Sequence, residues 1–295
     1  MFLSKICVFL SSILLFCTIN ISAEDINVEV EYQTELPDLK KEKGILYGDL
    51  DDILKRKTLV VCSNRDTNRP LFLMKKKNTK NLDLTGEDIE LAKKFAKALG
   101  VKLIFRCCYS SFDDVVDAIK NHEGDIGISE LSYTLHRSRK VIYTNPYVSL
   151  KKMILINRQI LEIYKSKSIK QLIEDGNFPV ATEDHSYVEF AQELFPKTKI
   201  LVINNWDKEI GNKLKNKKLI ATLNDETKIK TLLKNNPKLS MNLVPLILHG
   251  EKDCISTVIN FKGLKLSNWV NKFLKSEFPV ETIDNLLKKY EDYIY

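Results

Sequence analysis

Several sequence features that define common protein classes are missing from this chain. Beyond residue 23, no apolar run is long enough to cross a bilayer. No Cys-x-x-Cys or His-x-x-Cys spacing occurs, which argues against a structural metal site. No Gly-x-Ser-x-Gly motif occurs either, and the 4 histidines are scattered, so the sequence shows no nucleophilic triad. We therefore expect a chain without a metal or a cofactor.

The charge of the chain is basic, but its distribution does not fit a nucleic-acid surface. Lys and Arg number 46 and Asp and Glu number 39, which gives a net charge of +7. The lysines are spread along the chain between acidic residues, and no cluster of arginine and aromatic residues forms a reading surface. We expect a solvated lysine-rich surface and no nucleic-acid partner. Loose attraction to an anionic membrane stays open.

Residues 1–23 have the pattern of a signal peptide. Lys5 precedes an apolar run at 6–16, and small residues form a cleavage site before Glu24. The apolar run is too short to span a bilayer comfortably, so an uncleaved anchor is the weaker alternative. We expect a cleaved signal peptide and a periplasmic protein.

Removal of this segment leaves four of the 6 cysteines in the chain. In an oxidising compartment an even number permits disulfide bonds. Buried free thiols on core strands are the equal alternative, because cysteine is commonly buried. The four residues are Cys62, Cys107, Cys108 and Cys254.

The rest of the chain alternates strand-like and helix-like segments. Residues 24–49 are polar and show no sustained period, so we expect an extension or a loosely packed arm before the fold. Short β-rich apolar runs predict strands at 58–63, 102–106, 125–129, 153–156, 180–181, 200–203 and 219–223. Apolar periodicity and capping residues predict helices at 49–57, 86–100, 111–123, 168–175, 187–194 and 226–234. Two such series predict an α/β protein with two lobes and a mainly parallel sheet covered on both faces.

Several segments are similar, in the same order and spacing, to those of a known family. They are 69–72 (RPLF), 84–92 (LTGEDIELA), 124–126 (GDI), 132–137 (SYTLHR) and 141–147 (VIYTNPY). The last two are the most specific, since they are similar to the family pattern T-x-x-R … V-x-F-S-x-P-Y. The chain resembles the family 3 extracellular solute-binding proteins, the periplasmic receptors of polar amino-acid transporters. A strand near 255–261, followed by helices to the end, is similar to the return of that fold to its first lobe.

The resemblance implies a type II periplasmic-binding-protein fold with a hinge and a ligand cleft between two lobes. Residues 50–150 plus 249–295 would form the first lobe, and residues 151–248 the second. The expected function is the capture of a polar amino acid by hinge closure and its delivery to a membrane ABC permease. We expect a monomer.

The chemistry of an amino acid selects the residues of such a site. A receptor must pair both the carboxylate and the ammonium, because burial of an unpaired charge is costly. A planar guanidinium can bond both carboxylate oxygens. The resemblance gives this role to Arg137 and assigns the ammonium to Asp225. Further contacts implied by the resemblance come from hydroxyl groups, backbone amides and a helix N-terminus, at Ser129, Glu130, Ser132 and Ser186.

Each of these roles has an ordinary structural alternative. Arg137 lies in a basic run and can be an exposed charge. Asp225 can cap the helix predicted at 226–234, and both of its roles can coexist. Ser132 can be a turn hydroxyl.

Two departures from the family pattern concern the ligand. After the first strand the family has an aromatic residue that stacks on the ligand, whereas this chain reads SNRDTN at 63–68. Phe72 or Tyr133 is then the expected substitute. Glu130 stands where a small hydroxyl residue is common, which points to a cationic group on the ligand or to a salt bridge with Arg65.

Two other functions stay open at this point. One is an enzyme similar to the cyclohexadienyl dehydratases, which share this fold, with Glu130 or Glu183 as the acid. The other is a sensor or accessory module that binds a partner protein and no solute. The missing aromatic residue favours this second alternative.

Overall fold

The computed structural model describes most of the chain that follows residue 27. The predicted signal peptide, residues 1–23, lies outside the described residues. The described residues are 28–36, 47–66, 68–69, 71–76, 83–163, 167–183, 185–278, 280–290 and 293.

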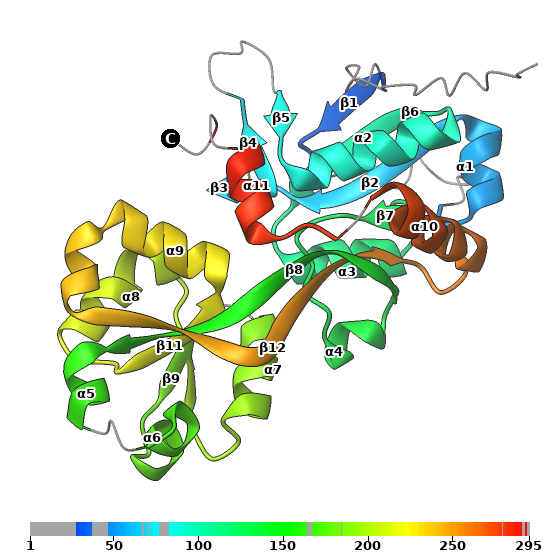
Figure 1. The fold of residues 1–295 in the computed structure, drawn as a ribbon. Helices are drawn as coiled ribbons and strands as arrows, with labels where there is room; N and C mark the ends of the chain where they lie inside the picture. The colour runs from blue at the N-terminus through cyan, green and yellow to red at the C-terminus, as the bar shows by residue number, and fades with distance from the viewer. Residues whose placement is uncertain are drawn as a thin grey trace, which may run out of the picture.

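Two α/β lobes are joined by two long strands that cross the middle of the molecule side by side (Figure 1). β8 (Ile142–Asn157) carries the chain from the first lobe to the second, and β12 (Leu243–Ile259) carries it back. The two strands pair antiparallel, so the connections form one ribbon. This arrangement confirms the predicted two-lobed α/β architecture. The predicted divisions, at 150/151 and 248/249, fall inside these strands and stay predictions.

The first lobe is a parallel sheet with helices on both faces. Its main elements are β1 (Val30–Gln33), α1 (Leu50–Arg56), β2 (Thr58–Asn64), α2 (Glu87–Leu99), β6 (Lys102–Tyr109), α3 (Phe112–Lys120), β7 (Ile126–Gly127), α4 (Leu135–Ser138), α10 (Leu264–Glu277) and α11 (Ile283–Lys289). A separate small sheet contains β3 (Asn68–Arg69), β4 (Leu73–Lys75) and β5 (Leu84–Thr85). α2, α10 and α11 pack on one face of the main sheet, and α3 packs on the other.

The second lobe repeats this layering. Its elements are α5 (Arg158–Ile163), α6 (Ile169–Asp175), β9 (Val180–Thr182), α7 (His185–Leu194), β10 (Ile200–Val202), α8 (Trp206–Lys215), β11 (Ala221–Asp225), α9 (Glu226–Asn235) and a short 3-10 helix (Pro237–Met241). α6 and α7 cover one face of its strands, and α8 and α9 cover the other. Alternate residues of β8 point to opposite faces of the sheet: Ile154 packs with α7, whereas Leu155 packs with α8.

All nine strands of the main sheet form one continuous ladder. The order is β1-β6-β2-β7-β12-β8-β11-β9-β10. Pairs within each lobe are parallel, and every antiparallel pair in this sheet involves β8 or β12. The crossing ribbon thus places the carboxyl ends of the parallel strands of both lobes near each other, where α/β sheets usually bind ligands.

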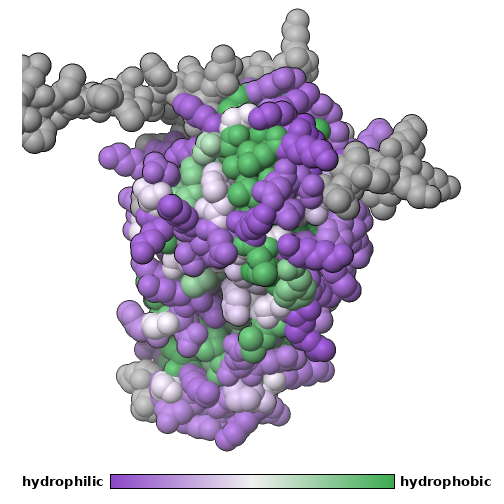
Figure 2. Space-filling model, turned by 90° about the vertical axis from the view of Figure 1, so that its right-hand side faces the viewer, coloured by the Kyte–Doolittle hydropathy of each residue, from purple (hydrophilic) through white to green (hydrophobic). Residues whose placement is uncertain are grey.

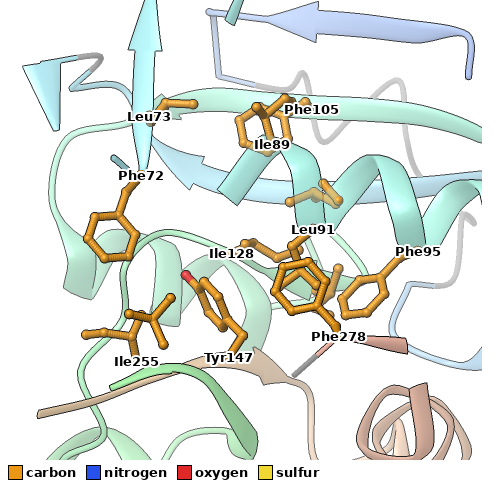
Figure 3. Close-up of a cluster of buried hydrophobic side chains, with 14 of the residues drawn as sticks. Phe72, Leu73, Ile89, Leu91, Phe95, Phe105, Ile128, Tyr147, Ile255 and Phe278 are labelled. Atoms are coloured by element: carbon orange, nitrogen blue, oxygen red, sulfur yellow. The ribbon is translucent and has the colours of Figure 1, made fainter. Parts of the chain in front are cut away.

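The core of the first lobe contains several residues of the segments that carried the resemblance. Figure 3 shows Phe72, Phe95, Tyr147 and Phe278 converging in this core, and all four are buried. The hydroxyl of Tyr147 donates a hydrogen bond of 2.6 Å to Asp88 Oδ1. The segments 84–92 and 141–147 therefore contact each other, so part of the family pattern serves packing.

The predicted elements are largely confirmed, and the differences have physical reasons. β8 and β12 are much longer than the predicted strands 153–156 and 255–261, because polar residues such as Lys151 and Lys152 in β8 and residues 249–253 in β12 interrupt the apolar pattern. α8 was not predicted, since its sequence WDKEIGNKLK has few apolar residues. Part of the segment 24–49, for which we expected an extension or a loosely packed arm, belongs to the main sheet. Val30–Gln33 pairs in parallel with β6, and the pairing uses backbone groups that no side-chain period reveals.

Two further observations concern the surface and the thiols. No helix in the described ranges combines the length and the apolar character that a membrane crossing needs. Figure 2 shows one face of the molecule, where hydrophobic residues form separate patches between hydrophilic ones. None of the four described cysteines is in a disulfide bond, and all but Cys254 are buried. Burial raises the pKa of the Cys62 thiol to about 12 and that of Cys108 to about 11. The structure therefore agrees with the free-thiol alternative.

Candidate functional site

A cleft of about 180 Å³ lies between the lobes and gathers polar residues from both of them. Its first wall comes from the end of β2, the segment after β7, and α4. Its second wall comes from the segment after β9, the end of β11 and the amino ends of α7 and α9, while β8 and β12 close it from behind. The lining residues are Asn64, Asp66, Ser110, Phe112, Glu130, Ser132, Arg137, Leu150, Glu183, Ser186, Tyr187, Asn224, Asp225, Lys228, Asp253 and Ile255.

Arg137 lines this cleft and is held firmly in the first lobe. It lies in α4, where the Thr134 hydroxyl caps the helix and accepts a hydrogen bond of 3.2 Å from the Arg137 backbone N–H. Its Nε donates to Asp113 Oδ1 at 2.8 Å, and its Nη1 donates to the Ser132 carbonyl at 3.5 Å. The residue is only 3% exposed. The alternative of an exposed basic residue is therefore wrong, and the guanidinium is oriented before any ligand arrives.

Ser132 connects the two lobes through Asp253 of β12. The Ser132 hydroxyl donates to Asp253 Oδ2 at 2.9 Å, and the Tyr187 hydroxyl of α7 donates to the same oxygen at 3.1 Å. The Ser132 backbone carbonyl also accepts a hydrogen bond of 2.9 Å from the Tyr143 hydroxyl. Burial raises the pKa of the Asp253 carboxyl to about 7, although both hydroxyl donors oppose this rise. Ser132 is thus more than a turn hydroxyl.

Asp225 ends β11 and caps α9, as the structural alternative predicted. Its Oδ1 accepts a hydrogen bond of 2.9 Å from the Lys228 backbone N–H. It is buried and also lines the cleft, so a cap and a ligand contact are compatible. Burial raises the pKa of this carboxyl, and the hydrogen bond from Lys228 opposes the rise.

An ion pair lies on the second wall of the cleft. Lys228 Nζ lies 3.1 Å from Glu183 Oε1, and Asn224 Nδ2 donates to Glu183 Oε2 at 3.2 Å. Burial raises the pKa of the Glu183 carboxyl, with Lys228 opposing it. Burial alone would lower the pKa of Lys228, but the carboxylates of Glu183, Asp207 and Glu130 raise it. Lys228 thus remains a cation that already has an anionic partner.

The cleft contains five of the seven residues that the sequence analysis assigned to ligand binding. They are Arg137, Ser132, Glu130, Asp225 and Ser186. Ser129 is fully buried behind the wall, where its hydroxyl accepts a hydrogen bond of 2.9 Å from the backbone N–H of Asn64. Arg65 is exposed and is not part of the lining. Both differ from the prediction because Ser129 follows a strand that turns its side chain inward, whereas Arg65 lies just past the end of β2.

Neither expected aromatic substitute reaches the cleft. Phe72 is buried in the first-lobe core, as Figure 3 shows. Tyr133 is 45% exposed and packs edge-on against Tyr143 at a centroid distance of 4.9 Å. The aromatic residues of the lining are Phe112, the first residue of α3, and Tyr187, in the first turn of α7 on the opposite wall. Each lies at the start of a helix predicted from the sequence, 111–123 or 187–194, and the helical periodicity gives no sign of a ligand contact.

Part of the second wall and the residues of the crossing strands were not predicted from the sequence. Lys228, Asn224 and Asp253 were not assigned to the site. Asp253 carried one usable signal, since it is a carboxylate shortly before a strongly apolar run in the last strand. Within the described part of the chain, no group of His, Cys, Asp and Glu could hold a metal ion. The polar and charged lining of the cleft is suited to a small polar solute bound by hydrogen bonds and charge.

Two α/β lobes joined by a paired ribbon, with charged residues of both lobes lining one cleft, define the class of hinged solute-binding proteins. Comparison with models of known protein families identifies the family within this class. The chain belongs to the bacterial extracellular solute-binding proteins of family 3, whose model matches residues 59–292. The resemblance inferred from the sequence is confirmed.

Individual relatives agree with this placement. The ABC transporter arginine-binding protein 1 of Escherichia coli (strain K12) is 23% identical over 162 residues, which are 55% of this chain and 62% of the relative. A probable histidine-binding protein of Neisseria gonorrhoeae is 26% identical over 164 residues, 56% of this chain and 59% of the relative. The chain thus spans about three fifths of the length of the curated relatives it matches.

A solved structure has the same fold over nearly its whole length. The amino-acid ABC transporter substrate-binding protein AbpA from Streptococcus pneumoniae, bound to L-arginine, matches with a TM-score of 0.60 and 23% identity. The match covers 83% of this chain and 98% of that chain. The predicted type II periplasmic-binding-protein fold is confirmed.

Proposed function

We propose that the protein captures a free amino acid between its lobes and presents the closed complex to a membrane ABC permease. One observation carries this proposal: Arg137 from the first lobe and Asp225 from the second line the same cleft. A guanidinium is suited to the carboxylate of an amino acid, and a carboxylate to its ammonium. Family membership supports the proposal, as do relatives whose names record the binding of arginine and histidine.

Hinge closure is the mechanism that the crossing ribbon supports. The chain passes between lobes only through β8 and β12, as far as the described residues show. Beside the cleft, the backbone N–H of Leu135 in the first lobe donates to Glu189 Oε1 in the second at 2.8 Å. Ligand shifts the lobes towards closure only by as much as it binds the closed state better than the open one. We propose that a single copy of the chain performs this cycle.

A ligand screen with a matched pair of variants tests the proposal. Thermal unfolding of the mature protein is measured with each common amino acid, since a ligand at 100 times its dissociation constant stabilises by about 2.7 kcal/mol. Arg137→Ala should weaken binding of the best ligand by at least about 30-fold, because it removes a buried charge-assisted pair. Arg139→Ala removes the same charge from an exposed site nearby and is the control. Equal affinities of the two variants would contradict the role of Arg137.

The dehydratase alternative has one observation in its favour. Glu183 lines the cleft, and burial raises the pKa of its carboxyl, as a general acid requires. The ancestral amino-acid-binding protein AncCDT-1, a precursor of cyclohexadienyl dehydratase, also has this fold, with a TM-score of 0.56 and 25% identity over 83% of this chain and 99% of that chain. We propose binding without turnover, because Glu183 is paired with Lys228. Conversion of prephenate or arogenate by the purified protein would establish the enzyme instead.

We further propose that residues 1–23 direct export and are removed, which leaves the mature protein in the periplasm. Support comes from the charged, apolar and small-residue order of this segment. The mass of the exported protein should correspond to a chain that begins at Glu24. A mass that includes the apolar run would show an anchored protein.

A further inference from the structure

Asp253 is a buried carboxylate, and one of its two oxygens, Oδ1, makes no contact within the described part of the chain that explains its burial. It lies on the crossing strand β12 and is 1% exposed. Oδ2 accepts the hydrogen bonds from Ser132 and Tyr187, whereas Oδ1 is buried and has no hydrogen-bond partner among the described residues. A buried acceptor without a donor costs free energy, so such groups commonly mark the position of a ligand or a water.

The position of Asp253 puts this oxygen within reach of a bound amino acid. Ser132 contacts both charged groups: its carbonyl accepts from Arg137 Nη1, and its hydroxyl donates to Asp253. Both charged residues line the cleft, with Asp225 across from them in the second lobe. A ligand with its carboxylate on Arg137 and its ammonium near Asp225 can therefore extend its side chain towards the crossing strand.

The charge of the lining favours a ligand with an additional positive group. The cationic lining residues, Arg137 and Lys228, already have anionic partners in Asp113 and Glu183. Against these two cations the lining contains five acidic residues: Asp66, Glu130, Glu183, Asp225 and Asp253. The excess negative charge attracts cations and disfavours anionic side chains.

Nearby bases do not neutralise Asp253 by direct contact. The charged groups that face it are Asp225, which raises the pKa of its carboxyl, and Lys152, which lowers it. Lys152 Nζ lies 3.7 Å above the ring of Phe190 and 3.7 Å from Glu251 Oε2, so its contacts are directed elsewhere. Among the residues that the structure describes, Asp253 therefore lacks the close cationic partner that a buried carboxylate normally needs.

We propose that Asp253 determines ligand specificity and that its Oδ1 accepts a hydrogen bond from the cationic end of a basic amino-acid side chain. This inference rests on the proposed function, since Arg137 and Asp225 must hold the backbone groups of the same ligand. An ammonium or guanidinium supplies both the missing donor and the missing charge. A neutral side chain of the same shape satisfies only the hydrogen bond and leaves the carboxylate charge unpaired.

The decisive experiment compares ligands that differ only in this charge. Binding of arginine and of citrulline, its neutral isostere, is measured by calorimetry on the mature wild-type protein and on Asp253→Asn. The wild type should prefer arginine, and the variant should lose about 10- to 150-fold of this preference, the range expected for a hydrogen bond to a charged group. Citrulline affinity should change by less than about threefold, because Asn keeps an oxygen for Ser132 and Tyr187. Asp117→Asn, an exposed carboxylate with an ordinary surface ion pair, is the control.

Each outcome decides between clear alternatives. An equal loss for both ligands would place the α-ammonium on Asp253 and overturn the inference, as would an unchanged preference. Failure of the wild type to bind any amino acid would instead refute the proposed function. Binding of neutral amino acids as tightly as basic ones would refute the inference and leave the proposed function intact.

A pH series on the wild type provides the same test if the variant does not fold. Burial raises the pKa of Asp253 to about 7, and only the ionised form pairs with a cation. The preference for arginine over citrulline should therefore increase between pH 6 and pH 8 and then level off, by up to about tenfold for each pH unit below that pKa. A preference that stays constant over this range would overturn the inference.

Discussion

The unfolding free energy of the ligand-free protein should depend on Asp253 in an unusual direction. Its folded-state pKa, raised to about 7 by burial, lies well above the value near 3.8 of a free aspartate. Between these values the folded protein holds a proton that the unfolded chain has released. Stability therefore falls as the pH rises through this window, by about 1.4 kcal/mol per pH unit for this one group.

Asp253→Asn isolates this contribution from those of other titrating groups. Asn cannot ionise and keeps an oxygen that accepts from Ser132 and Tyr187. Between pH 5 and pH 7 the wild type should lose about 2 kcal/mol of stability relative to the variant, and above pH 8 the difference should be constant. At pH 8 the ligand-free variant should then be the more stable protein, because the wild type must bury an ionised carboxylate that has no ligand to pair with.

Urea unfolding monitored by circular dichroism at several pH values measures this difference. Linear extrapolation gives the free energy in water, and an unchanged slope with urea shows that the mutation did not alter the unfolded state. Bound amino acid must be removed by refolding before the measurement, since ligand stabilises the folded state. A wild-type-minus-variant difference that is the same at pH 5 and pH 8, within about 0.5 kcal/mol, would refute the reasoning, because it would mean that folding does not raise the pKa of Asp253.

Two further predictions concern residues that build the first lobe. Asp125→Ala should lower the unfolding free energy, measured by urea unfolding, by about 3 to 6 kcal/mol. The substitution removes the acceptor of the Gly48 and Val60 backbone N–H groups and the partner of Arg56. A loss no larger than that of Asp117→Ala, at its exposed ion pair, would contradict this prediction. Gly86→Ala should cost at least about 2 kcal/mol by the same assay, since Gly86 has φ +122° and a new Cβ would lie 2.3 Å from the Phe72 carbonyl. Gly100→Ala, at φ +64° with open space, is its control and should cost less.

Much of the fold could be predicted from sequence because its signals are local. The strand 58–63 and the helices 86–100 and 111–123 were predicted from apolar periodicity and from capping residues such as Ser111, whose hydroxyl accepts a hydrogen bond from the Asp114 backbone N–H. These patterns report which side of an element is buried, whatever it packs against. The alternation of such elements was also sufficient to indicate two α/β lobes.

The candidate site was predictable only where a local motif marks it. Arg137 follows its helix cap, Thr134, by three residues, so a short contiguous motif was sufficient to identify it. Asp253 meets Ser132 across 121 residues of sequence and Tyr187 across 66. No periodicity in the sequence indicates a contact between residues so far apart along the chain.

The sequence by itself determined the identity of most secondary-structure elements, the two-lobed class and the arginine of the cleft. The tertiary structure decided which polar residues share that cleft, that Ser129 and Arg65 lie outside it, and that β12 brings Asp253 to its back wall. The physical reason is that backbone periodicity is set by neighbours along the chain. The environment of a buried charge is set by side chains that only the crossing of β8 and β12 brings together.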